Sequence, residues 1–309
     1  MIASPQFHDQ LSGSKRMSSI PRLNAAIRAF ETGNIAFTAF CPPDTGSAQA
    51  IAAAPYDAVV IEMEHNPFDV KGLRDCLQYM LDPRRIAAAG HVAPPVTPMV
   101  RLPCNGAEMN QWMAKQVLDM GVYGIIWPHI RTVEEARSAV AACRYARPVE
   151  AANVLPHGRR GDGPGIAARY WGLTQPEYYA RADVWPIDPK GEILVGMMCE
   201  SVEAVENLPR ILKEVPGMGL VIIGEGDLSQ NLGFPRQYDH PVVVKAMNAI
   251  LETCKAHGVV CGHPHVGAKN VDGLIEEGYR WLMATPTRSF SALERGRERV
   301  KELASARKS

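Results

Sequence analysis

The sequence has no pairing pattern among its cysteines and no hydrophobic run long enough to cross a bilayer. Its seven cysteines are scattered, odd in number and form no CxxC pair, which argues against a disulfide framework and a structural zinc site. No stretch of about 18 apolar residues occurs, and residues 1–21 contain no apolar core of the kind that an export signal needs. We therefore expect a cytoplasmic protein with reduced thiols and no membrane partner.

The sequence also lacks an excess of positive or negative charge. Lysine plus arginine and aspartate plus glutamate number 33 each, so the formal net charge is zero. Without a net field, the chain is not expected to bind nucleic acid or an anionic membrane, and a small anionic metabolite suits it better. Its 309 residues fit one barrel of about 250 residues with extensions, or two smaller domains.

What the sequence does contain is a series of eight short apolar runs separated by helical patterns. They cover residues 35–40, 58–64, 97–102, 123–129, 192–200, 219–227, 258–265 and 280–286. Apolar runs without strict alternation are typical of parallel strands covered on both faces, and the segments between them carry helix-spaced apolar residues. Eight strands alternating with helices predict an α/β fold, a (β/α)8 TIM barrel.

We expect an N-terminal extension over residues 1–24 and a single barrel domain over residues 25–309. Residues 147–191, rich in Gly, Pro, Arg and Trp, interrupt the alternation between the fourth and fifth strands. Such an insertion is either a lid or an oligomer contact. The last helical segment is basic and amphipathic, and it is either a solvated end or a surface that packs on a neighbouring subunit.

Acidic and basic side chains follow several of these runs, at the points where the predicted strands end. Catalytic groups of such barrels gather at this C-terminal rim. A carboxylate after a long apolar run needs a cation, because an unpaired buried charge costs several kcal/mol. The side chains are Glu62, Glu64 and His65 after the second run, Arg101 after the third, Glu200 after the fifth and Asp227 after the sixth.

Glu200 and Asp227 are the candidate metal ligands. Two carboxylates from neighbouring strands, without a His or Cys close by in sequence, are typical of a site for Mg²⁺, Mn²⁺ or Co²⁺. Alternatively, each carboxylate caps the helix that follows, and both interpretations are compatible at a strand-to-helix junction. His263 and His265, at the end of the seventh run, either face the same rim or form a turn.

Arg101 and His65 are the candidate catalytic residues. The Arg101 guanidinium is placed to clamp a carboxylate or to stabilise an oxyanion; the alternative is a structural pair with Glu62 or Glu64. His65 stands one residue after Glu64 and three after Glu62, so an imidazole–carboxylate dyad for acid and base catalysis is geometrically easy. The alternative is a hydrogen-bonded structural histidine.

Taken together, these residues resemble the HpcH/HpaI family of class II pyruvate-dependent aldolases over about residues 25–295. The resemblance is carried by YDAVVIEMEHNP, VRLP, KQVLDMGVYGIIWPHI, GRRG, ILVGMMCES and VIIGEGDLSQNLG. It implies a barrel with a divalent cation held by Glu200 and Asp227, a pyruvate oxygen stabilised by Arg101, and an acid/base dyad of His65 with Glu62. It also implies that the C-terminal helix packs on a neighbour in a homo-oligomer, a trimer or a hexamer.

Three departures from the family pattern bear on substrate binding. The family commonly has Asp at Glu62, Gln at Met198, and Gly-Pro-Ala-Asp where this chain reads Gly-Glu-Gly-Asp at 224–227. Met198 removes an amide donor from the floor of the site, whereas Glu225 adds an acid beside the metal. The amides of Gly224 and Gly226 are expected to orient the donor carboxylate, because glycine permits close approach.

The expected function is that of a divalent-metal-dependent aldolase, which cleaves or forms 4-hydroxy-2-oxo acids through a pyruvate enolate and an aldehyde. A Schiff-base route would need a lysine at a strand end, and none of the eight runs ends with one. Two alternatives are open. One is a 2-oxo-acid decarboxylase or acyl-CoA lyase that uses the same enolate, and the other is a barrel that binds a metabolite without converting it.

Overall fold

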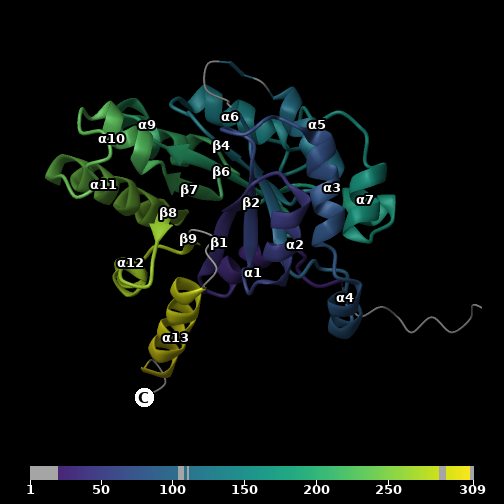
Figure 1. Ribbon diagram of the computed structural model, residues 1–309. Coiled ribbons are helices and arrows are strands. Elements are labelled where there is room, and N and C mark those ends of the chain that lie inside the picture. Colours follow the sequence, from purple (N-terminus) through teal and green to yellow (C-terminus); the bar gives the residue numbers. More distant parts are fainter. Residues whose placement is uncertain (1–19, 104–107, 110, 285–289, 307–309) are drawn as a thin grey trace, which may run out of the picture.

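Eight parallel strands form a closed ring in the computed structural model, which describes residues 20–103, 108–109, 111–284 and 290–306 (Figure 1). The ring strands are β1 (Ala36–Cys41), β2 (Ala58–Glu62), β3 (Thr97–Arg101), β4 (Gly124–Trp127), β6 (Ile193–Cys199), β7 (Leu220–Ile223), β8 (Val260–Val266) and β9 (Trp281–Ala284). The ring closes because β4 pairs with β6 and β1 pairs with β9. A short additional strand, β5 (Val184–Trp185), pairs with β6 outside the ring. The predicted (β/α)8 barrel is confirmed.

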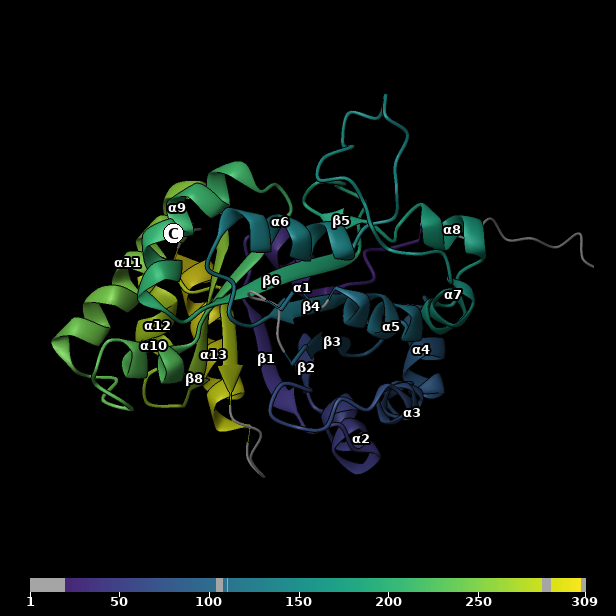
Figure 2. The same ribbon diagram turned by 90° about the horizontal axis from the view of Figure 1, so that it is seen from above.

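Helices follow the strands and surround the ring (Figure 2). They are α1 (Ala25–Glu31), α2 (Thr45–Ala53), α3 (Val70–Met80), α4 (Pro83–Ala89), α5 (Trp112–Met120), α6 (Val133–Ala142), α7 (Gly165–Trp171), α8 (Gln175–Tyr179), α9 (Val202–Glu214), α10 (Glu225–Asn231), α11 (Pro241–His257), α12 (Val271–Glu277) and α13 (Ser291–Ala306). Local sequence sets many of their ends: Thr132 and Glu135 form a capping box before α6, and left-handed Gly258 ends α11. None of the helices in this described part is long and apolar enough to span a membrane.

Alternation along the strands decides which side chains reach the inside of the ring. The inner core includes Val60, Met99, Ile126, Met198 and Ile222, and residues of α1 pack against it. Successive side chains of a strand point to opposite faces, so residues two positions further along a strand point to the same side. Glu62 follows Val60 in this way, Arg101 follows Met99, and Glu200 follows Met198. The sequence therefore directs all three charged side chains inward at the end of the ring where the strands finish.

The sixth predicted run, 219–227, is only partly a strand. Strand β7 ends at Ile223, and Glu225 begins α10 with Gly224 as its N-cap. The expectation that Asp227 ends a strand is therefore wrong, because the chain turns helical at Gly224. Asp227 lies instead in the first turn of α10.

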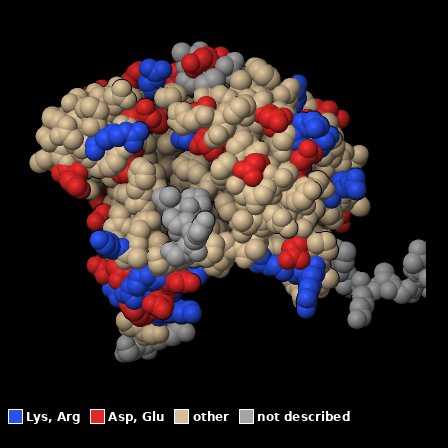
Figure 3. All heavy atoms as spheres, in the orientation of Figure 1, with Lys and Arg blue, Asp and Glu red and all other residues tan. Residues whose placement is uncertain are grey.

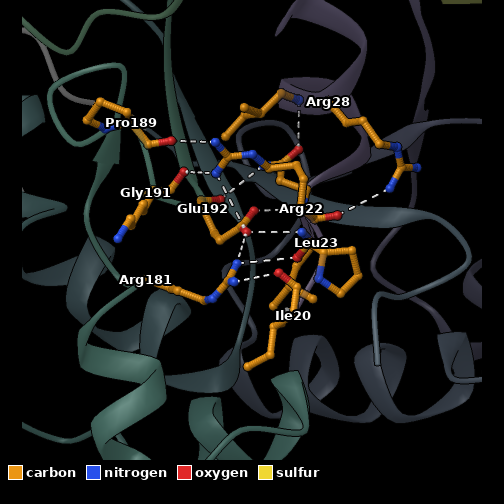
Figure 4. Close-up of polar contacts among 12 residues, drawn as sticks. Ile20, Arg22, Leu23, Arg28, Arg181, Pro189, Gly191 and Glu192 are labelled. Atoms are coloured by element: carbon orange, nitrogen blue, oxygen red, sulfur yellow. Dashed lines mark hydrogen bonds and ion pairs between the residues drawn. The ribbon is translucent and has the colours of Figure 1, made fainter. Parts of the chain in front are cut away.

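Residues 20–24 pack against the barrel. The buried Glu192 carboxylate accepts hydrogen bonds from the backbone N–H groups of Leu23 and Asn24, at 3.0 and 2.9 Å, and Arg181 pairs with it at 2.8 Å (Figure 4). These contacts join residues 23 and 24 to the barrel, whereas residues 1–19 fall outside the described residues, and the boundary of the extension stays a prediction.

The insertion at 147–191 packs where the strands begin. Trp171 of α7 stacks on Tyr123, with ring centroids 4.3 Å apart, and donates to the carbonyl of Gly121 at 2.7 Å. Tyr123 immediately precedes β4, so these contacts lie at the end of the ring opposite to Glu62 and Glu200. This placement does not fit a lid over the C-terminal rim, and the oligomer contact stays a prediction.

Helix α13 projects from the body of the barrel (Figure 1) and forms ion pairs with the rest of the chain. Arg295 pairs with Asp272 of α12 at 2.5 Å and Arg297 with Asp57 at 3.2 Å. Figure 3 shows basic and acidic side chains mixed over this end of the molecule. The basic face is thus partly neutralised, and packing of α13 on a neighbouring subunit stays a prediction.

The cysteines show no disulfide where the structure describes them. The six in these ranges are free and buried: Cys41, Cys76, Cys143, Cys199, Cys254 and Cys261. Cys104, the seventh, lies outside the described residues.

Candidate functional site

Arg101 lies between two acidic side chains at the rim. Its Nη2 contacts Oε2 of Glu62, and its Nη1 lies 2.9 Å from Oε2 of Glu64. Strand pairing brings the first pair together, because Glu62 of β2 stands opposite Arg101 of β3. The guanidinium also lies 4.5 Å above the ring of Phe40. The structural pairing weighed as an alternative for Arg101 is therefore present, and it holds the guanidinium at the mouth of the barrel.

Two further features of Arg101 bear on ligand binding. Its buried Nε has no hydrogen-bond partner among the described residues. A buried donor without a partner is costly, so a bound oxygen atom would satisfy it. Below the guanidinium, Met198 places its Sδ 3.3 Å from Nη1. Met198 is thus part of the site floor, where it offers no amide donor.

His65 does not form the expected ring contact with Glu62. Oε1 of Glu62 accepts the backbone N–H groups of Glu64 and His65, at 2.7 and 3.2 Å, while its other oxygen contacts Arg101. The His65 imidazole lies instead 3.8 Å from Oε2 of Glu64, and its side chain is 70% exposed. The dyad prediction is corrected accordingly. Glu62 binds Arg101 and the backbone N–H groups of Glu64 and His65, and Glu64 is the carboxylate beside the His65 imidazole.

Glu200 and Asp227 line one hollow, of about 480 Å³, at the same rim. The other lining residues are His129, Arg131, Ser201, Gln230 and Asn231. Glu200 directly follows β6, and Asp227 is in the helix that follows neighbouring β7. Neither carboxylate caps a helix, since Ser201 and Gly224 are the N-caps of α9 and α10. The capping alternative is therefore wrong. Both carboxylates line one hollow, and metal ligation by them stays a prediction.

His129 is a site residue that sequence reasoning did not single out. Its backbone N–H donates to Oε1 of Glu200 at 2.5 Å, and its ring Nδ1 lies 3.3 Å from the same oxygen. On the other side, Nε2 lies 3.4 Å from Oε1 of Glu64. Glu64 raises the pKa of His129 to about 9, with Glu200 and Asp227 adding to the effect. Its position at the end of the fourth run was the signal that would have found it.

The residues of this hollow fit a hard divalent cation. Burial raises the pKa of Glu200, and the nearby Glu64 and Asp227 carboxylates raise it further, which a bound cation would relieve. Gly224 makes room for this carboxylate: a Cβ there would lie 2.5 Å from Oε2 of Glu200. No cluster of three or more His, Cys, Asp or Glu side chains suited to a metal occurs in the described ranges. The chain would thus supply two oxygen ligands and leave positions for water and substrate.

Gly224 and Gly226 differ in what their amides can bind. The N–H of Gly224 donates to the carbonyl of Cys199 at 3.1 Å, so the expectation that it orients a substrate carboxylate is corrected. Gly226 lies in the first turn of α10, where amides lack an acceptor within the helix. A side chain added at Gly226 would meet no described atom within 4 Å. Gly226 alone keeps the predicted role.

Glu225 faces away from the candidate metal ligands. Its buried carboxylate contacts Nδ1 of His265 and lies 3.9 Å from Nε2 of His263, in a separate hollow of about 810 Å³ between α11 and α12. The expectation that Glu225 adds an acid beside the metal is therefore wrong. Both histidines lie within strand β8 (Val260–Val266), so the turn interpretation is wrong. Nδ1 of His263 accepts the N–H of His265 at 3.3 Å, and burial lowers the pKa of His263 to about 4.

Comparison with known proteins identifies the family. The profile of the HpcH/HpaI aldolase/citrate lyase family matches residues 40–285. The chain belongs to this family. All of the rim residues described above lie within the match.

Relatives of this HpcH/HpaI protein include the 2-keto-3-deoxy-L-rhamnonate aldolase of Klebsiella pneumoniae. It is 34% identical over 216 residues, which are 70% of this chain and 68% of that protein. The aldolase of the same name from Salmonella gallinarum is 32% identical over the same share of each chain. With named aldolases as relatives, the HpcH/HpaI protein described here is an enzyme of the lyase class.

Solved structures agree on the fold. An HpcH/HpaI aldolase/citrate lyase family protein from Burkholderia cenocepacia superposes with a TM-score of 0.69 at 26% identity, over 91% of this chain and 99% of that one. A citrate synthase, SbnG, gives 0.63 at 25% identity, over 91% and 96%. Macrophomate synthase, at 24% identity and a TM-score of 0.65 over 95% and 93%, supports the fold alone.

Proposed function

We propose that this enzyme is a divalent-metal-dependent aldolase that cleaves or forms 4-hydroxy-2-oxo acids, with pyruvate as the donor. The observation that carries the proposal is the shared hollow of Glu200 and Asp227 at the barrel rim, close to Arg101 and His65. The relatives named as aldolases of a 2-keto acid support the same reaction class. The substrates would be a small 2-oxo acid and an aldehyde, with no nucleic acid or membrane involved.

Glu200 and Asp227 would hold Mg²⁺, Mn²⁺ or Co²⁺, because their oxygens are hard ligands and both line the hollow. Such a cation, when bound, supplies a Lewis acid that draws electrons from the 2-oxo group. Arg101 stabilises the negative charge that develops on the enolate oxygen, with its unpaired Nε and its Nη groups as donors. The first-turn amide of Gly226 orients the donor carboxylate.

His65 is the proposed acid and base. In the cleavage direction, His65 takes the proton of the 4-hydroxyl group, directly or through water. The C3–C4 bond breaks, its electron pair forms the enolate, and the aldehyde leaves. Protonation of C3 then yields pyruvate. The side chain is 70% exposed and lies beside Glu64 at 3.8 Å, so it has both access to a substrate and a neighbouring carboxylate.

Pyruvate release from a 4-hydroxy-2-oxo acid tests the proposal. Treatment with EDTA should abolish the release, and Mg²⁺, Mn²⁺ or Co²⁺ should restore it. Undiminished activity of the metal-free enzyme would refute the assignment of Glu200 and Asp227 as metal ligands.

A second candidate uses the same enolate differently. This candidate is a 2-oxo-acid decarboxylase or a lyase acting on an acyl-CoA. The family description includes citrate lyase and one structural relative is a citrate synthase, so aldol cleavage is not the one reaction named among the relatives. Turnover of oxaloacetate or a CoA thioester in preference to hydroxy-oxo acids would select this candidate.

We also propose that the enzyme is a cytoplasmic homo-oligomer, a trimer or hexamer, in which α13 packs on a neighbour. Light scattering coupled to gel filtration gives the subunit number. A monomer with full activity would exclude this assembly.

A further inference from the structure

The loop after β4 reaches across the mouth of the barrel at His129. One side of this residue contacts Glu200, through the 2.5 Å hydrogen bond of its N–H and through Nδ1 at 3.3 Å. The other side contacts Glu64, through Nε2 at 3.4 Å. Glu64 in turn lies 2.9 Å from Nη1 of Arg101 and 3.8 Å from the His65 ring. His129 therefore connects the proposed metal ligand with the proposed catalytic pair.

These contacts engage only one oxygen of Glu200. Both the N–H and Nδ1 of His129 face Oε1. Oε2 lies toward Gly224, where a Cβ would come within 2.5 Å of it, and Gly224 is the N-cap of the helix that carries Asp227. His129 thus fixes Oε1 of Glu200. The other oxygen, Oε2, faces the first turn of α10, which carries Asp227.

The backbone at His129 is in a conformation that its residue type seldom adopts. Its φ is +58°, a left-handed value that is uncommon for residues other than glycine and that marks a constrained position. In this conformation the N–H of His129 faces the Glu200 carboxylate. The hydrogen bond to a buried charged group is of the strong, charge-assisted kind.

We infer that His129 is a positioning residue for Glu200: it holds Oε1 so that Oε2 and Asp227 can ligate the same cation. The inference rests on the proposed function, because it assigns the role toward a metal held by Glu200. A positioning contact around a metal ligand changes metal affinity by about tenfold to a hundredfold when it is removed. His129 touches neither the reacting atoms nor the cation in this role.

Direct binding of Mn²⁺, followed by electron paramagnetic resonance of free Mn²⁺, tests the inference without turnover. His129→Gly removes the ring and suits the left-handed backbone, and it should weaken Mn²⁺ binding by about tenfold or more. His129→Asn also tolerates this backbone and keeps a side-chain donor, so its affinity should stay within about threefold of wild type. In the enzyme assay, His129→Gly should raise the KM for the 2-oxo acid more than it lowers kcat.

Arg236→Gly is the matched control, since Arg236 is an exposed residue with a φ of +57° and lies outside the site. It should bind Mn²⁺ as the wild type does. Wild-type affinity in His129→Gly, together with loss of binding in Glu200→Gln, would overturn the positioning role and leave the proposed function intact. Absence of Mn²⁺ binding by the wild type would overturn the proposed function and this inference with it.

Discussion

Glu225 and Asp227 stand two residues apart in the first turn of α10, yet their side chains line different hollows. Asp227 faces the hollow that it shares with Glu200, whereas Glu225 faces the groove between α11 and α12 and contacts His265. The chain therefore separates two neighbouring acids into a candidate metal ligand and a structural group.

This separation predicts opposite effects for two similar substitutions. Asp227→Asn should weaken Mn²⁺ binding by about tenfold or more, because it removes a charged ligand. Glu225→Gln should leave the affinity within about threefold and instead lower the thermal midpoint, because it weakens the contact of this buried carboxylate with His265. Titration of each variant with Mn²⁺, with thermal unfolding alongside, checks both. Equal losses of affinity in the two variants would contradict the separation.

Gly224 provides a steric test of the same site. A methyl group at Gly224 would lie 2.5 Å from Oε2 and 2.6 Å from Cβ of Glu200, whereas one at Gly226 would meet no described atom within 4 Å. Gly224→Ala should thus displace the carboxylate and weaken Mn²⁺ binding by about tenfold. Gly226→Ala, which keeps its amide, is the matched control and should bind as the wild type does. If both variants bind Mn²⁺ with the same affinity, the close approach of Gly224 to Glu200 has no part in positioning this carboxylate.

His65→Gln tests the proposed acid and base. Loss of proton transfer should lower kcat by about 10²-fold or more, while Mn²⁺ affinity stays unchanged because His65 contacts neither Glu200 nor Asp227 in the described structure. His257→Gln, at an exposed helix end, is the control. A near-normal kcat in His65→Gln would return His65 to the structural alternative.

Asp183 ties the insertion to the barrel and predicts a pH dependence of stability. Burial alone would raise the pKa of this carboxyl, but hydrogen bonds from the buried Arg144 lower it below the ordinary value of 3.8. Because the folded-state pKa is depressed, the stabilisation is present above pH 3.8 and is lost as the pH falls through the folded-state pKa. Asp183→Asn should lower the free energy of unfolding at pH 7 by about 3 kcal/mol, since it leaves Arg144 buried and uncompensated.

Urea unfolding of wild type and Asp183→Asn at several pH values measures this difference. The gap between the two proteins should narrow below pH 3.8. Asp188→Asn is the control, because this more exposed carboxylate lies 3.6 Å from Arg147 and should change stability only slightly. If the difference in unfolding free energy between the two proteins is the same at all pH values, the charge of Asp183 is not the cause of that difference.

The sequence predicted the barrel because its eight apolar runs have the length and composition of buried parallel strands. It also placed Glu62, Arg101 and Glu200 correctly at strand ends, since a charged residue after such a run marks the rim. The end of β7 was misplaced because Gly-Glu-Gly-Asp is compatible with a continued strand as well as with a helix start. Only the packing of the chain in three dimensions selects the helix.

The partners of the acidic residues were harder to predict. Glu62 and Glu64 point to the same side of β2 and its end, so spacing alone gave either one to His65. The parallel register sets Glu62 opposite Arg101, so Glu62 pairs with Arg101 and Glu64 is left beside His65. The register between two strands cannot be predicted from the sequence of either strand alone. His129 was missed for a similar reason: its left-handed backbone and its two carboxylate contacts involve residues 64 and 200, which are distant in the sequence.

The central claim, that Glu200 and Asp227 hold a cation which supports enolate formation, is tested most directly by deuterium exchange of the pyruvate methyl group. Proton NMR in D₂O should show exchange with wild type and Mg²⁺, none after EDTA treatment, and at least about 10²-fold slower exchange in Glu200→Gln and Asp227→Asn. Exchange that continues at the wild-type rate in metal-free enzyme or in these two variants would contradict the account.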